Sequence, residues 1–65
     1  MKGIMYFNNR PDEEVIKHIG FVKAGIFVTL SGIYLRIDDS YYRYLKDADS
    51  FIACPDIRKV EMEEE

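Results

Sequence analysis

The alternation of apolar and polar residues between positions 26 and 37 is the feature that most constrains the fold of this chain. Successive side chains of a strand point to opposite faces of a sheet, so a period of two indicates β-structure. If Ser31–Gly32 forms a two-residue turn, the flanking strands make a hairpin. Its cross-strand pairs on one face are then all aliphatic: Leu30 with Ile33, Val28 with Leu35, and Ile26 with Ile37. Because a slip of one residue would mix the two faces, the pattern also predicts the register.

A second turn is predicted at Asp38–Asp39–Ser40, between residue 37 and the tyrosine-rich segment that follows. A loop with an even number of residues places Tyr42 and Tyr44 on the aliphatic face. An odd number would place Arg43 there, which is costly for an unpaired charge. We therefore expect an antiparallel meander over residues 26–45 whose aliphatic face packs against the rest of the chain.

The segment before the meander carries the signals of a short helix. Pro11 suits the first helical position, and the three acidic residues after it suit the positive end of a helix dipole. Gly20 stands where helices commonly end. The sequence predicts a strand over residues 2–7 and then a two-turn helix, Pro11–Ile19, that depends on packing for its stability.

Two further short strands, over residues 51–54 and 57–62, complete the predicted fold. The expected class is α+β: an antiparallel meander of five or six short strands with one short helix. The tight meander resembles that of small SH3-like barrels, a likeness of fold that carries no function. Residues 1–60 are expected to form one globular domain. Residues 61–65, rich in glutamate, are expected to form an acidic tail that is either a solvated end or a partner-binding or autoinhibitory segment.

Composition narrows the class of protein. The single cysteine, Cys54, cannot form a disulfide within one chain and favours a reducing, cytoplasmic compartment. The content of 48% hydrophobic residues is too high for a disordered chain. No apolar run approaches the roughly 20 residues that span a bilayer, so no membrane partner is expected.

Few residues in the chain could carry catalysis or bind a metal. There is one histidine and one cysteine, which fall short of a catalytic triad or a zinc site. Cys54 lies in an apolar segment and is expected to be a small buried hydrophobe. His18 is expected to be either structural or merely exposed. The aspartate pairs at 38–39 and 47/49 fit turns, where aspartate bonds the local backbone. We therefore expect no enzyme, no cofactor and no metal.

The face of the meander opposite the aliphatic one is the sharpest functional feature of the sequence. It carries aromatic and basic residues together, with two arginines expected opposite one another, where they would repel unless an anion or carboxylate lies near. The residues of this predicted face are Phe27, Thr29, Tyr34, Arg36, Tyr41, Arg43 and Leu45.

Three interpretations compete for this Tyr/Arg face: a structural surface, a protein interface and a nucleic-acid site. Tyr and Arg are enriched at interface hot spots, and a domain this small gains stability from a partner. We expect a small non-enzymatic module for hetero- or self-association. Its binding residues are predicted to be Phe27, Tyr34, Arg36, Tyr41, Arg43 and Lys46. The alternative is weak, sequence-tolerant binding of single-stranded nucleic acid by the same face, with bases stacked on tyrosines and phosphates held by the cations.

Overall fold

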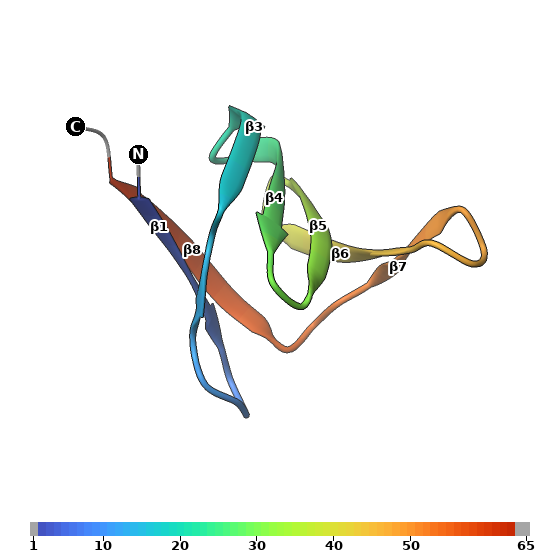
Figure 1. The fold of residues 1–65 in the computed structure, drawn as a ribbon, viewed down its shortest axis with the longest axis horizontal. Coiled ribbons are helices and arrows are strands. Elements are labelled where there is room, and N and C mark those ends of the chain that lie inside the picture. Colours follow the sequence, from blue (N-terminus) through green and yellow to red (C-terminus); the bar gives the residue numbers. More distant parts are fainter. Residues whose placement is uncertain (1, 64–65) are drawn as a thin grey trace.

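The computed structural model describes residues 2–63, and within them the chain forms strands and turns but no helix (Figure 1). The predicted α+β class is therefore wrong, and the fold is all-β. The strands are antiparallel and form two sheets, ordered β2-β1-β8 and β3-β4-β5-β6-β7. Their bounds are β1 (Lys2–Phe7), β2 (Glu13–Glu14), β3 (Lys17–Phe21), β4 (Ala24–Thr29), β5 (Gly32–Ile37), β6 (Ser40–Leu45), β7 (Ser50–Ala53) and β8 (Ile57–Glu63).

The segment predicted to be a helix is extended and passes from one sheet to the other. The Val15 amide donates to the Gly3 carbonyl (2.8 Å) in the small sheet, and the next amide, of Ile16, donates to the Val28 carbonyl (2.7 Å) in the large one. A two-turn helix is marginal by itself, and the β-branched residues of this segment favour strands. Pairing with two neighbouring strands therefore outweighs the helix-start signals at Pro11.

A second corner joins the sheets between β7 and β8. The Cys54 amide donates to the Tyr41 carbonyl and the Asn8 amide to the Asp56 carbonyl, both at 2.8 Å. The two predicted C-terminal strands are thus confirmed as β7 and β8, as is the N-terminal strand β1. Each sheet keeps its own ladder, so the described strands do not close into the barrel that the SH3-like resemblance implied.

The meander is present, but its first turn lies one residue earlier than predicted. Thr29 pairs with Gly32, so the turn is Leu30–Ser31, and Val28 faces Ile33 instead of Leu35. Moving both partners by one residue leaves the side chains of the paired residues on their predicted faces, whereas Leu30, predicted on the aliphatic face, lies in the turn. The second turn has two residues, as an even loop requires, and its first residue, Asp38, has a φ of 53°, which aspartate tolerates.

The predicted pairing of Arg36 with Arg43 is wrong. Arg36 lies opposite Tyr41, and Arg43 lies opposite Tyr34. Each arginine therefore faces a tyrosine ring, and the repulsion that suggested a bound anion does not arise.

The predicted orientation of the sheet is also wrong, because its Tyr/Arg face turns inward. Phe27 and Tyr34 are 0% exposed. They pack against the apolar side chains of the small sheet and of the segments that join the two sheets. The buried core consists of Met5, Phe7, Val15, Phe27, Tyr34, Cys54, Ile57 and Val60. Large aromatic side chains bury about 150–250 Å² each, so turning Phe27 and Tyr34 inward fills the space between the sheets.

Part of the segment predicted to be an acidic tail belongs to a strand. Strand β8 continues through Glu61 to Glu63, which pairs with Lys2. Residues 64–65 lie outside the described range. No helix able to cross a membrane occurs between residues 2 and 63.

Candidate functional site

The residues predicted to bind a partner do not form one accessible surface. Phe27 and Tyr34 lie in the core and have no exposed area. The Phe27 ring stacks on the His18 ring, with centroids 4.5 Å apart and planes 3° from parallel. The Tyr34 ring meets Phe7 edge to face at 6.2 Å. These two aromatic rings serve packing between the sheets.

Arg36 is held by its own hairpin. Its Nε donates to the Asp38 carbonyl at 2.6 Å, and its Nη2 lies 4.0 Å from the Asp39 carboxylate. Its guanidinium lies 5.2 Å from the centre of the half-buried Tyr41 ring. The β5–β6 turn thus supplies the partners of this arginine.

Arg43 and Lys46 lie apart from that pair. The Arg43 Nη2 donates to the Ser31 carbonyl at 3.1 Å, and its guanidinium lies 5.9 Å from the Tyr34 ring centre. Lys46 is exposed in the turn after β6. The structure therefore brings the predicted site residues together in two separate Arg–Tyr pairs and leaves Lys46 outside both.

A polar cluster closes one end of the core. The Glu13 carboxylate accepts hydrogen bonds from Thr29 Oγ1 (2.7 Å) and Ser31 Oγ (2.6 Å). The Ser31 and Tyr34 hydroxyls lie 2.9 Å apart, and Arg10 reaches both Glu13 and the Tyr34 hydroxyl at 3.4 Å. A buried tyrosine needs a partner for its hydroxyl, and this cluster supplies one while tying β2 to the β4–β5 turn. Its hydroxyl and carboxylate groups bond one another, and the Arg10 Nε, which has no hydrogen-bond partner among the described residues, lies 3.3 Å from the Asp56 carboxylate. We therefore assign the cluster a structural role.

Cys54 lies beside this cluster and is buried, as expected. Its thiol donates to the Asp56 carboxylate at 2.9 Å, and Asp56 also pairs with Arg10 at 3.3 Å. Burial, with the Asp56 carboxylate adding to it, raises the pKa of the Cys54 thiol to about 11. The hydrogen bond from Cys54, and to a lesser degree the Arg10 charge, lower the pKa of Asp56. At neutral pH this thiol is protonated, which is unlike a catalytic nucleophile.

Cys54 is accordingly expected to react slowly with iodoacetamide. Raising a thiol pKa from 9.0 to about 11 lowers the thiolate fraction at pH 8 about 100-fold. The alkylation rate of the folded protein at pH 8, followed by mass spectrometry, should be lower than that of the chain in guanidinium by at least this factor. Equal rates in the two states would contradict the placement of this side chain.

The side of the large sheet turned away from β1, β2 and β8 is exposed and apolar. We call it the outer face. Lys17 is its only charged residue among those described, and within residues 2–63 no further segment covers it. The register places on it Lys17, Ile19 and Phe21 from β3; Ala24, Ile26 and Val28 from β4; Ile33, Leu35 and Ile37 from β5; Ser40, Tyr42 and Tyr44 from β6; and Phe51 and Ala53 from β7.

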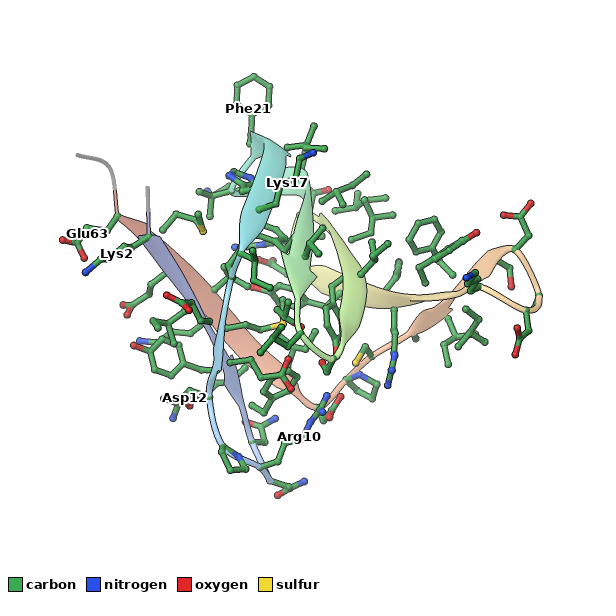
Figure 2. All side chains as sticks on the ribbon, viewed as in Figure 1. Lys2, Arg10, Asp12, Lys17, Phe21 and Glu63 are labelled. Atoms are coloured by element: carbon green, nitrogen blue, oxygen red, sulfur yellow. The ribbon has the colours of Figure 1, made fainter. Side chains whose placement is uncertain are left out.

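Large apolar side chains of the outer face stand in contact with solvent. Phe21 is 78% exposed and projects from the body of the molecule (Figure 2), while Ile19 and Ile37 are 53% and 50% exposed. At the opposite edge the rings of Tyr44 and Phe51 lie 5.2 Å apart, and the Tyr44 hydroxyl donates to Asp49 at 2.8 Å. The face therefore has an aromatic residue at each lateral edge and, between the edges, aliphatic residues together with Tyr42 and Ser40.

The area of the outer face follows from the geometry of its strands. Five strands about 4.8 Å apart, each about six residues long, span roughly 20 × 20 Å, or about 400 Å² in projection. Side chains standing above that plane expose more. Apolar patches of several hundred Å² on a small protein commonly mark interaction sites.

The sequence identified this aliphatic set correctly but assigned it to the core. Both sides of the meander are apolar enough to be buried, because Phe27, Tyr34 and Tyr41 stand opposite the aliphatic side chains. An apolar pattern on both sides is typical of strands covered on both faces. The sequence therefore signalled that both faces of the meander are apolar, and not which of them packs against the small sheet.

Comparison with models of protein families, with curated proteins and with solved structures found no match for the chain. Within residues 2–63 no three His, Cys, Asp or Glu side chains gather in a way that could hold a metal ion.

Proposed function

We propose that the protein is a small, non-enzymatic protein-interaction module that binds another polypeptide through the outer face. The observation that carries the proposal is the exposure of Ile19, Phe21 and Ile37 on a face with one charge at its corner. Interface centres are depleted in charge, enriched in aromatic side chains and more apolar than the rest of a protein surface. A location in the cytoplasm, favoured by the lone cysteine, belongs to the same proposal.

Binding of single-stranded nucleic acid is less well supported. It needs exposed aromatic platforms beside several cations. Tyr34 has no exposed surface, Arg36 and Arg43 are engaged by backbone carbonyls, and Lys17 is the sole cation on the described part of the outer face. The exposed apolar side chains therefore fit a protein partner better than a nucleic acid.

Site-specific photo-crosslinking in cells tests the proposal. We would replace Phe21 by the photoreactive analogue p-benzoyl-L-phenylalanine, which preserves a large aromatic side chain on the outer face. The matched control is the same replacement at Leu30, which is 95% exposed but lies in the β4–β5 turn, outside the strands that form that face. We expect position 21 to crosslink to a polypeptide, position 30 to give no such product, and a Leu35→Lys change to abolish the crosslink. Equal products from positions 21 and 30 would contradict the proposal.

A further inference from the structure

We infer that the polypeptide bound by the outer face is a second copy of this chain, and that two copies pack face to face as a two-fold β-sandwich. The inference rests on the proposed function and names its partner. Sheets packed in this way lie about 10 Å apart with their side chains interdigitated. Sheet packing would then give the outer face the cover that residues 2–63 of a single copy do not provide.

The charge of the outer face favours an identical partner. A face that selects a different protein commonly carries charges complementary to it, whereas self-pairing brings like charges together and favours a face with few. Lys17, at one corner, is the one charged residue among the described strand residues of this face, and the Asp49 carboxylate reaches its opposite edge at the Tyr44 hydroxyl. The net charge of −3 comes from acidic residues elsewhere. Two outer faces can therefore meet without burying an acidic group at their centre.

The position of Lys17 is compatible with two-fold symmetry. A two-fold axis between the copies lies in the plane of the sheets and runs either along the strands or across them. An axis along the strands places β3 over β7 of the second copy. Lys17 then lies over the corner of the sheet that contains Phe51. An axis across the strands brings it over the corner of Phe21. In both arrangements the ammonium group meets an aromatic ring, a favourable contact.

The accessible surface area of the chain and the area of the outer face bear on pairing with a second copy. The chain exposes 4698 Å², against about 4,300 Å² expected for a folded monomer of this mass. Each outer face covers about 400 Å² in projection, and its side chains add to that area. The area buried by two such faces approaches the roughly 1,000 Å² that specific interfaces exceed. The proposed interface thus lies at the low end of the size range of specific interfaces.

Leu35 is the centre of the proposed interface. It is the middle outward residue of β5, which is the middle strand of the sheet, and its cross-strand neighbours are Ile26 and Tyr42. In an isologous pair a residue on the axis meets its own copy. A lysine at this position would place two ammonium groups together in the driest part of the contact, so Leu35→Lys should weaken pairing at least about 30-fold.

Sedimentation equilibrium of the full-length chain tests the inference. We expect the wild-type protein to have twice the chain mass of 7.7 kDa at micromolar concentration, and Leu35→Lys to have the mass of one chain. The matched control, Leu30→Lys, places the same change on an exposed leucine outside the face and should keep the double mass. Ile37→Lys, at a half-exposed position of the face, repeats the test should Leu35→Lys fail to fold by circular dichroism.

The outcomes separate this inference from the proposed function. A wild-type mass of one chain at every concentration overturns self-pairing, and so does a mass above two chains, because one face-to-face contact leaves no outer face free. If the chain sediments as a monomer while position 21 still crosslinks to a different protein, the proposed function stands and the second copy is the wrong partner. A monomer without any crosslink from position 21 removes both.

Discussion

Phe27→Ala is expected to leave most of the molecules unfolded, because it removes the side chain at the centre of the core. Phe27 is 0% exposed and stacks on His18 between the sheets. Removing a buried phenylalanine costs about 3–5 kcal/mol. A domain of 65 residues has a free energy of unfolding of only about 3–10 kcal/mol. Urea denaturation followed by circular dichroism measures the loss.

The control for this prediction is Phe21→Ala, the same change on the outer face. Phe21 is 78% exposed, so its removal should lower the free energy of unfolding by about 0.5 kcal/mol or less. Both variants should be made in the Leu35→Lys background, so that pairing of two copies does not contribute. A loss at Phe21 as large as that at Phe27 would show that the sheet faces the other way.

Gly25→Ala is expected to cause the second-largest loss of stability. Gly25 is buried in β4, opposite Gly20. A Cβ there would lie within 2.6 Å of the Ile19 carbonyl oxygen and also against that of Phe21. Both atoms are backbone, so relief requires the β3–β4 hairpin to open. Overpacking of this kind costs about 1–3 kcal/mol, which thermal or urea denaturation can resolve.

Gly3→Ala provides the comparison for Gly25→Ala. Its added Cβ would meet the Sδ and Cε atoms of Met62, the latter at 2.8 Å. A methionine side chain is flexible and can move aside, so the loss should be clearly smaller than at Gly25. Equal losses at the two glycines would contradict the close approach of β3 and β4.

The correct parts of the sequence-based prediction came mostly from the strand pattern and from the residues of the turns. The period of two over residues 26–37 predicted the hairpin and the sorting of its faces, and the prediction of an even turn placed Tyr42 and Tyr44 on the face that carries Leu35. These are local properties, because the pleat alternates side chains whatever packs above them. The helix at Pro11–Ile19 failed for the opposite reason. The segment does contain residues that favour the start of a helix, but its backbone bonds to Gly3 and Val28, which are distant in sequence.

The inward turn of the Tyr/Arg face depends on packing that sequence pattern does not show. Tyr34 is buried because Ser31, Arg10 and the Glu13 cluster satisfy its hydroxyl. Those partners come from two other segments. The position of the charged residues favoured an exposed Tyr/Arg face, since Arg36 and Arg43 both lie on it. Both arginines find partners at the rim of the core, so they do not force the face outward.

The orientation of the large sheet is the central claim, because the outer face is available to a partner only if Tyr34 points inward. The most direct measurement is a nuclear Overhauser spectrum of the protein in solution, with the Phe7 ring as the reporter on β1. We expect contacts from the Phe7 ring protons to the Tyr34 ring, whose centroid lies 6.2 Å away in an edge-to-face arrangement. Contacts from Phe7 to the methyl groups of Leu35, with none to Tyr34, would contradict the account.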